Sequence, residues 1–193
     1  ASLFGVTLHR GRVCFARQHC RPQGGLGMSK LHRVWKVGAD VDTDQLAPGA
    51  YMKLGIHDIA KHCLEGVRPE FAAEVSLGDV LAAGPNFGIG SSREQAADAL
   101  VKLGVKAVIA PSYSGLYFRN AFNLGLLLLT CKDAELLQEA EQISLDLDQW
   151  AVVRSNGQRL ACDPIPDFLV AMVEAGGLLP QLKLRLQQQR ASQ

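Results

Sequence analysis

Short aliphatic runs alternate with stretches of helical spacing along most of this chain. From Leu31 onward the apolar residues gather in runs of a few positions, and glycine, proline or polar residues bound each run. One such run contains Val108 and Ile109 and stops at Pro111, and the run at 126–130 is typical of a buried strand. The same pattern predicts strands at residues 34–37, 80–83, 106–110, 126–130 and 143–147.

Helical segments separate several of these runs. Across residues 91–103 the apolar side chains recur at helical spacing, and Gly104 supplies a stop signal. Residues 167–175 repeat that spacing and end at Gly176. Strands that alternate with helices in this way predict a single α/β domain whose helices pack on a partly parallel sheet. Further helices are predicted at 113–123 and 134–140, and the pattern from 178 onward permits another.

The C-terminal third also contains a hairpin signal. Asn156-Gly157 lies between two short apolar stretches, 150–153 and 159–162. Asn-Gly is the strongest short-range signal for a tight turn between paired strands. We therefore predict an antiparallel hairpin at this point of the chain.

Charge and hydropathy exclude two classes of partner. The formal net charge is +1, with no dense block of one sign, so the chain lacks the basic surface of a general nucleic-acid binder. The longest purely aliphatic run, 126–129, is far too short to cross a bilayer. We expect a soluble globular protein with no nucleic-acid partner and no membrane partner.

The cysteines do not form a recognisable framework. Their number is odd, their spacing is wide, and none belongs to a C-x-x-C pair or to a Cys/His cluster with zinc spacing. Free thiols in a reducing compartment are therefore expected, and this chain is not expected to hold a metal alone. The five residues are Cys14, Cys20, Cys63, Cys131 and Cys162.

The first residues differ from the rest. No acidic residue precedes Asp40, whereas arginines recur up to Arg21, and Met28 begins the first segment of ordinary composition. Such a leader is compatible with an organelle transit segment, but it is poor in serine and has no amphipathic stripe. We expect residues 1–30 to be a flexible basic extension, a leader or an added sequence, residues 31–185 the domain, and 186–193 a polar tail. The expected compartment is the cytoplasm, or an organelle matrix if the leader is a transit segment.

The segment with the clearest chemistry follows the second predicted strand. Gly88 and Gly90 lie between that strand and a predicted helix, where backbone amides can approach a ligand and a helix start favours an anion. Ser91 and Ser92 add hydroxyl groups, and Arg93 adds a two-pronged donor that suits a carboxylate. Together they predict a site for a small carboxylic acid.

A plain structural explanation fits the same residues equally well. Ser91 and Glu94 have the spacing of a capping box, in which the serine caps the helix and the glutamate bonds back to it. A phosphate loop fits less well because the Gly-Lys-Ser/Thr ending is absent, and a dinucleotide fingerprint lacks its third glycine. From these residues alone, a capped helix and a carboxylate site remain open.

Four ordered motifs resemble one family. The sequence 90–94, Gly-Ser-Ser-Arg-Glu, resembles the signature of the aconitase-type hydro-lyases in their swivelling domain. Residues 42–45, Asp-Thr-Asp-Gln, resemble the family's first loop, and 117–125 contain its Arg-Asn-x-x-Asn-x-Gly element. Residues 168–179 resemble its C-terminal helix. Within the family the chain is most similar to the 3-isopropylmalate dehydratase small subunits, which implies a swivelling β/β/α domain over 31–185.

The resemblance implies a role for each matching residue. Ser91 would be the catalytic base, acting as an alkoxide that removes the proton next to a substrate carboxylate. Ser92 and Arg93 would bind that carboxylate beside Gly90, and Asp44 would support the site from the first loop. Such a base needs a strongly lowered pKa, which a helix start, amide donors and a nearby arginine would favour.

The resemblance also implies a partner and a cofactor. A larger subunit would hold a [4Fe-4S] cluster, whose open iron would take the leaving hydroxyl as a Lewis acid, so no cofactor is expected on this chain. The implied reaction is the dehydration and rehydration of a malate derivative, first 2-/3-isopropylmalate in leucine biosynthesis. Homoaconitate, citraconate or a dimethylmaleate-type acid are alternative substrates. A non-catalytic carboxylate-binding regulatory module is an alternative of another class, and a purely structural domain is a third.

Several positions depart from the family pattern and bear on the substrate. The family commonly has Cys where Ile89 stands, His at Gln95 and Arg at Gly115. Lys53 is a candidate to bind a substrate carboxylate from a mobile loop. The alternative is that it is simply a surface lysine. The first loop lacks the arginine that clamps a second carboxylate in aconitase, and its apolar residues favour an alkyl-bearing substrate. Those residues are Leu46, Ala47, Tyr51, Met52 and Leu54.

Other polar residues have a secondary place. His57, His62 and Cys63 suggest a metal site, but five-residue spacing puts the histidines on different helix faces, which favours a surface role. Arg119 and Asn120 are candidates to orient the site or to support a helix end. Asp40 and Asp42 are candidates to support the loop or to form Asx turns there.

Overall fold

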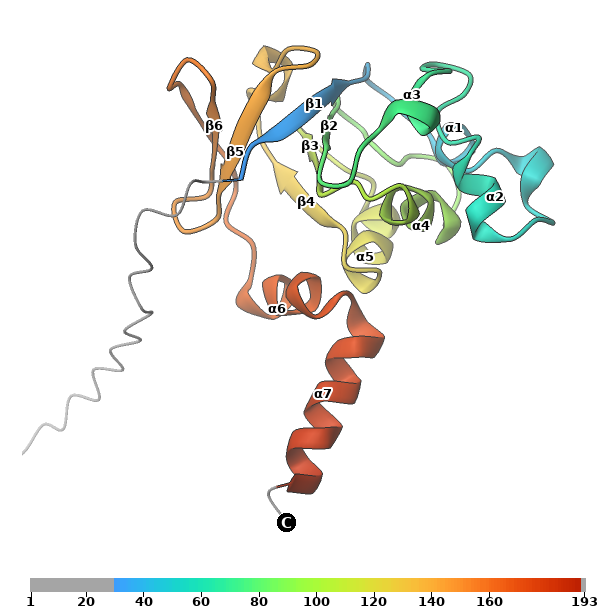
Figure 1. Cartoon of the computed structure of the whole chain (residues 1–193), viewed down its shortest axis with the longest axis vertical. Coiled ribbons are helices and arrows are strands. Elements are labelled where there is room, and N and C mark those ends of the chain that lie inside the picture. Colours follow the sequence, from blue (N-terminus) through green and yellow to red (C-terminus); the bar gives the residue numbers. More distant parts are fainter. Residues whose placement is uncertain (1–29, 192–193) are drawn as a thin grey trace, which may run out of the picture.

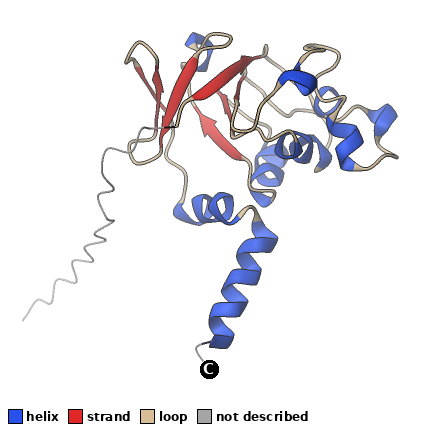
Figure 2. Cartoon of the chain, viewed as in Figure 1, coloured by secondary structure: helices blue, strands red, loops and turns tan. Residues whose placement is uncertain are grey.

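The computed structural model describes residues 30–191, so the predicted extension over 1–30 lies outside the described residues except for Lys30. Seven strands form one sheet in the order β4-β3-β2-β1-β5-β6-β7 (Figures 1 and 2). The sheet and its covering helices confirm the predicted α/β class. The strands are β1 (His32–Lys36), β2 (Val80–Ala82), β3 (Ala107–Ala110), β4 (Leu127–Thr130), β5 (Gln142–Asp146), β6 (Ala151–Arg154) and β7 (Arg159–Ala161).

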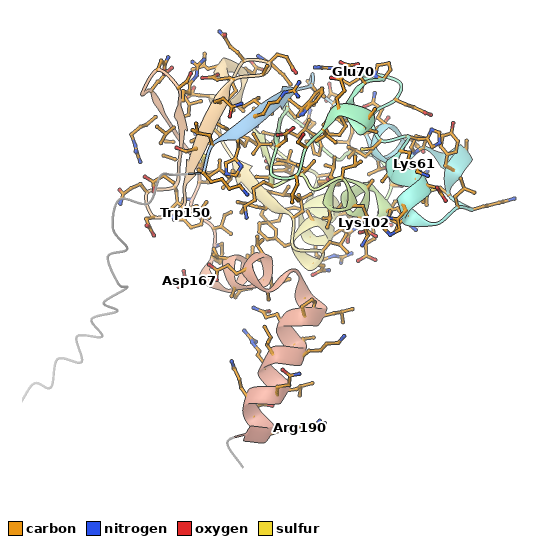
Figure 3. The ribbon with its side chains drawn as sticks, viewed as in Figure 1. Lys61, Glu70, Lys102, Trp150, Asp167 and Arg190 are labelled. Atoms are coloured by element: carbon orange, nitrogen blue, oxygen red, sulfur yellow. The ribbon has the colours of Figure 1, made fainter. Side chains whose placement is uncertain are left out.

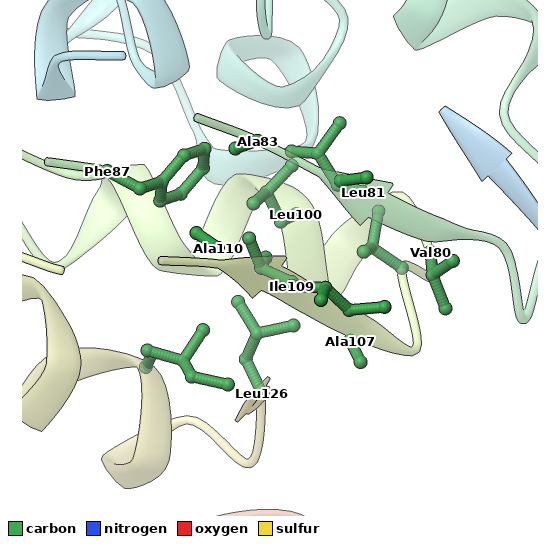
Figure 4. Close-up of a cluster of buried hydrophobic side chains, with 14 of the residues drawn as sticks. Val80, Leu81, Ala83, Phe87, Leu100, Ala107, Ile109, Ala110 and Leu126 are labelled. Carbon is green, nitrogen blue, oxygen red and sulfur yellow. The ribbon is translucent and has the colours of Figure 1, made fainter. Parts of the chain in front are cut away.

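The first four strands are parallel and form the centre of the core. Val34 of β1 lies opposite Val80 of β2, and Leu81 of β2 lies opposite Val108 of β3. Every residue of β2 and β3 is buried, as expected for parallel strands covered on both faces. Figure 4 shows their side chains packed with Leu100 of α4 and with residues of the following loops.

The last three strands are antiparallel and only partly buried. β5 pairs with β1 and β6, and β6 pairs with β7 through the predicted turn, where Gly157 has φ 82°. Their outward positions carry ion pairs, such as Arg159 with Asp146 at 2.6 Å. The sheet curls so that the ends of its outermost strands approach each other, and Asp163 N–H donates to Thr130 O at 2.8 Å.

The helices surround this sheet unevenly. In Figure 1, α1–α3 lie at the end of the molecule opposite β5 and β6, while α6 and α7 lie below. α6 spans the predicted residues and ends at Gly176, whose φ of 82° gives the left-handed helix stop. The helices are α1 (Thr43–Leu46), η1 (Gly49–Tyr51), α2 (Ile56–Ala60), α3 (Phe71–Glu74), α4 (Gln95–Lys102), α5 (Gly115–Asn123), η2 (Ala134–Leu136), α6 (Asp167–Ala175) and α7 (Leu178–Ala191).

α7 projects from the body of the domain. Figure 3 labels Arg190 near its far end and Asp167 at the start of α6. The helix continues across residue 185, where the domain was predicted to end, and carries exposed leucines along its length. Within residues 30–191, no helix has the length and apolarity needed to span a membrane.

Two predicted helices were wrong in extent. The segment 134–140 forms only the short 3-10 turn η2, because its backbone and side chains bond to β1 instead. Ala140 N–H donates to Val34 O at 2.8 Å, and the Glu139 carboxylate accepts the Lys36 N–H at 2.7 Å. The segment 91–103 forms a helix only from Gln95, because the backbones of Ser91 and Ser92 bond to the side chains of Thr43 and Asn120 instead.

Candidate active site

The candidate site forms where two parallel strands end side by side. The chain leaves β1 into the loop before α1, and it leaves β2 into the loop 84–94. Gly88 N–H donates to Val41 O at 2.7 Å, and Thr43 N–H donates to Ile89 O at 2.9 Å. These bonds join the two loops into one surface at the carboxyl ends of the strands, where open α/β sheets place their ligand sites.

A capping box fixes the first loop. Gln45 N–H donates to Asp42 Oδ1 at 2.7 Å, and Asp42 N–H donates to Gln45 Oε1 at 3.1 Å. The reciprocal pair starts α1 and holds its first residues in place. Asp42 therefore has the structural role that was one of its two predicted roles.

The capping box predicted at Ser91 was wrong. Helix α4 begins at Gln95, its N-cap Glu94 has helical φ and ψ, and no side chain caps it. The preceding serines turn toward partners outside the helix, so Ser91 does not sit at a helix start. A favourable helix dipole therefore does not act on Ser91 in the way that the sequence suggested.

The two glycines of the loop are required by close neighbours. Gly88 has φ 77°, and a Cβ there would lie 2.2 Å from Cγ of Tyr117, which packs beneath the loop. Gly90 has φ 101°, and a Cβ there would lie 3.1 Å from Thr43 Oγ1.

Burial raises the pKa of Tyr117 and of Cys63, so both stay protonated at neutral pH and place no charge under the loop.

Ser91 is held by a residue of the first loop. Ser91 N–H donates to Thr43 Oγ1 at 3.0 Å, and the two hydroxyl oxygens lie 2.9 Å apart. Thr43 is 1% exposed, whereas Ser91 is half-buried and reachable from solvent. The predicted base therefore has a fixed place and an open side.

Arg93 reaches the same loop from the other end of the motif. Its Nη1 donates to the Asp44 carboxylate and, at 3.1 Å, to Ala47 O. These bonds use both hydrogens of Nη1. Among the described residues Nε and Nη2 have no hydrogen-bond partner, so one edge of the guanidinium remains available for a two-pronged contact with a carboxylate.

Asn120 fixes the middle of the motif from α5. Its Nδ2 donates to Ser92 O at 3.0 Å, and the residue is 7% exposed. Ser92 itself is exposed at the surface of the loop. Of the two roles considered for Asn120, this bond gives it the role of orienting the site.

Lys53 lies apart from these contacts. It is exposed in the turn after η1, and within the described chain it forms no bond to Ser91, Ser92 or Arg93. Tyr51, just before it, stacks on His62 with ring centroids 3.5 Å apart, which anchors the start of this turn. Of the loop's apolar residues, Leu46 and Ala47 belong to the core, so they do not face a ligand as the sequence suggested.

The departures from the family pattern occupy different surroundings. Ile89 contributes its carbonyl to the junction with Thr43, and Gln95 is the first residue of α4. Gly115 begins α5, and nothing lies within 4 Å of a Cβ built there, so a larger residue would fit.

The described residues offer no ligand set for a metal centre. No group of three or more His, Cys, Asp or Glu side chains in residues 30–191 could hold a metal ion. His62 Nδ1 pairs instead with the Glu65 carboxylate at 2.6 Å.

The assembled groups can bind and deprotonate a small acid. The free edge of Arg93 and the hydroxyl of Ser92 can hold a carboxylate, while Ser91 Oγ is positioned to exchange a proton near it. Thr43 was not singled out from the sequence, although it stands within the Asp-Thr-Asp motif that was. Ser91 and Arg93 are partly exposed and Ser92 is exposed, whereas Thr43 is buried.

Comparisons with known proteins agree with this geometry. The family model for the aconitase C-terminal domain matches residues 74–134. The 3-isopropylmalate dehydratase small subunit 1 of Archaeoglobus fulgidus is 43% identical over 151 residues, which cover 77% of this chain and 94% of that protein. The methanogen homoaconitase small subunit of Methanothermobacter thermautotrophicus is 41% identical over 150 residues, with 76% and 86% covered.

A solved structure extends the likeness to the fold. The crystal structure of 3-isopropylmalate dehydratase from Methanocaldococcus jannaschii superposes with a TM-score of 0.79 at 36% identity, covering 84% of this chain and 98% of that one. By sequence, fold and the Gly-Ser-Ser-Arg-Glu loop, the chain belongs to the aconitase-type hydro-lyases, in the family of the 3-isopropylmalate dehydratase small subunits.

Proposed function

We propose that this chain is the small subunit of a heteromeric hydro-lyase that isomerises 2- and 3-isopropylmalate, with Ser91 as its base. The observation that carries the proposal is that the segment 43–47 binds both Ser91, through Thr43, and Arg93, through Asp44 and Ala47, on the joined loops after β1 and β2. Membership of the family supplies the reaction class.

The chain's residues account for binding and proton transfer. Arg93 and Ser92 bind the substrate carboxylate, and Asp44 holds the guanidinium through Nη1, which leaves Nε and Nη2 for the ligand. The Ser91 alkoxide takes the proton from the carbon next to that carboxylate. A new O–H bond forms as the C–H bond breaks, its electron pair becomes the C=C bond, and hydroxide leaves the neighbouring carbon.

The rest of the site is proposed to belong to a large subunit. That subunit would hold the [4Fe-4S] cluster, which supplies Lewis-acid assistance to the leaving hydroxyl. A half-site that lies open on this chain fits a partner that covers it. We place the reaction in a reducing compartment, the cytoplasm or an organelle matrix, which suits the free thiols of Cys63, Cys131 and Cys162.

Homoaconitate is the second candidate substrate. One relative is named as a homoaconitase subunit, and Lys53 is an exposed cation near the start of α2 that a longer acid could reach. The half-buried Met52 and exposed Leu54 beside it favour an alkyl group instead. We therefore favour isopropylmalate over homoaconitate.

The test is reconstitution with a matching large subunit under anaerobic conditions. Turnover is followed by absorbance of the unsaturated intermediate, with isopropylmalate, homocitrate and citramalate compared as substrates. We expect Ser91→Ala to lose more than about 100-fold in kcat while assembly is unchanged. Normal turnover by Ser91→Ala would show that Ser91 is not the base. A clear preference for homocitrate would make homocitrate the proposed substrate in place of isopropylmalate.

A further inference from the structure

Thr43 has an unusual combination of burial and contacts. It is one of the few polar residues of the described chain with almost no exposure, at 1%. Its hydroxyl meets Ser91 twice, at the backbone N–H and at Oγ, across 48 positions of sequence. The direction of the Thr43 hydroxyl hydrogen decides whether this buried group can stabilise the proposed base.

Either hydroxyl could donate when both are neutral, but the direction of the Thr43 hydrogen is set once Ser91 is an alkoxide. A threonine hydroxyl has one hydrogen and two lone pairs. Ser91 N–H occupies one lone pair, and among the described residues the only other partner of Thr43 Oγ1 is Ser91 Oγ. When Ser91 is an alkoxide it has no hydrogen to give, so the bond requires the Thr43 hydrogen to point at it.

The backbone holds Thr43 in this position before any ligand arrives. Its N–H is bonded to Ile89 O, and it stands at the first position of the helix that Asp42 caps. Gly90 leaves the space for the approach, since a Cβ there would crowd Thr43 Oγ1. The donor is therefore preorganised, which makes its contribution larger than that of a mobile group.

We propose that Thr43 is a positioning residue, whose hydroxyl donates to Ser91 Oγ and stabilises the alkoxide form of the base. The proposal rests on the function proposed above. The sequence suggested that a helix start would stabilise the Ser91 alkoxide, but α4 begins only at Gln95. The Thr43 hydroxyl takes that stabilising role instead.

Other charged groups adjoin the same loop and must be held constant. Asp42 and Asp44 lie on the α1 side, Arg93 and Glu94 on the loop itself, and Arg119 on α5. None of them changes in the variants below. A difference in pH dependence between those variants therefore reports the hydroxyl of Thr43.

The experiment compares two substitutions in the reconstituted complex. Thr43→Val keeps the branched shape and removes the hydroxyl, whereas Thr43→Ser keeps the hydroxyl and removes the methyl group. We expect Thr43→Val to lose about 10- to 100-fold in kcat at pH 7, with KM nearly unchanged. The acid limb of its kcat profile should move up by about one to two pH units, because the base loses a donor to its charged form.

The controls separate a chemical role from a packing role. Thr43→Ser should stay within about threefold of the unchanged protein in kcat, since the donor remains. Thr130→Val, in β4 and outside the site, should leave the profile unmoved. If Thr43→Val does not assemble, Thr43→Ala is measured in its place, because it removes the hydroxyl without pressing a methyl group on Ser91 N–H.

Two outcomes would overturn different claims. An assembled Thr43→Val or Thr43→Ala complex whose acid limb stays in place, while Ser91→Ala is inactive, would overturn the inference and leave the proposed function intact. Full turnover by Ser91→Ala would overturn the proposed base first, and with it the role of Thr43.

Discussion

The parallel strands β1–β4 and the antiparallel strands β5–β7 share one sheet but place their polar residues differently. In the parallel half β2 and β3 are wholly apolar and β4 has a single threonine, and polar groups gather in the loops after β1 and β2. In the antiparallel half the polar groups lie along the strands and their turns, as in the half-exposed ion pair of Arg159 with Asp146 at 2.6 Å. The first arrangement concentrates reactive groups at one end, whereas the second spreads them over a face.

The contrast indicates which half tolerates change. A loop that depends on close backbone contacts and on a single direction for each donor has few allowed substitutions. Ion pairs along a half-exposed strand contribute less, since solvent screens them and the side chains lose entropy. Paired substitutions, one in each half, can test this difference directly.

The largest effect is expected from paired glycine substitutions. Gly88→Ala should destabilise the protein by about 3 to 5 kcal/mol, because it combines a left-handed backbone with a clash against Tyr117. Gly157→Ala has nearly the same φ but nothing within 4 Å, so it should cost only about 1 to 2 kcal/mol. Urea denaturation measures both, and equal costs would contradict the argument from close contact.

An arginine pair tests the chemistry of the two halves. Arg93→Lys should lower kcat/KM by about 100- to 1000-fold, because a lysine has no two-pronged edge for the carboxylate. Arg159→Lys, in the exposed pair with Asp146, should leave turnover unchanged. Steady-state kinetics of the reconstituted enzyme decide, and near-normal activity of Arg93→Lys would exclude the proposed carboxylate contact.

A carboxylate of the antiparallel half predicts a pH dependence. Burial alone would raise the pKa of Glu141, but bonds from the Arg154 guanidinium and the Gln138 N–H bring it below its ordinary value. Its stabilising effect is therefore present above the unfolded pKa near 4.5 and is lost as the pH falls through the lowered folded pKa.

Glu141→Gln should accordingly lower Tm by about 2 to 4 °C at pH 7 and by less at pH 3. Thermal unfolding followed across pH values provides the measurement. Glu74→Gln, at an exposed position of α3, serves as the control for the loss of one carboxylate. A deficit for Glu141→Gln that stays constant down to pH 3 would rule out the linkage.

The smallest effect is expected at Tyr117, which is compared here with Tyr113. The Tyr117 hydroxyl is buried without a hydrogen-bond partner in the described chain, so Tyr117→Phe should leave Tm unchanged or raise it by about 1 to 2 °C. The Tyr113 hydroxyl contacts Val108 O and Leu129 O, each at 2.9 Å, so Tyr113→Phe should lower Tm by about 2 to 4 °C. Calorimetry of both variants checks the sign of the difference.

Strands and the main motif could be predicted from sequence because local patterns determine them. Each of the five strands predicted from the apolar runs lies within about two residues of its position, since an apolar run has few other ways to be buried. The Ser91–Arg93 segment was placed beside the first loop through its resemblance to a family, and the structure joins the two loops there.

The remaining errors come from contacts far apart in sequence. The start of α4 was placed at Ser91, but Thr43 and Asn120 bind the polar groups that a helix would have used. The turn η2 was extended into a helix because the bonds from Ala140 and Glu139 to β1 have no local signal. Thr43 was not predicted as a site residue, because a threonine between two aspartates has no periodic pattern that would mark it.

The curl of the sheet affects how readily the free subunit can aggregate. Unpaired strand edges recruit other chains and promote aggregation, and a sheet of seven strands would ordinarily present two of them. Here the outer strands span only Leu127–Thr130 and Arg159–Ala161, and the bond between Thr130 and Asp163 links the chain just beyond them. In the proposed complex, the short outer strands of this subunit would therefore leave little edge for a second copy to pair with before the large subunit binds.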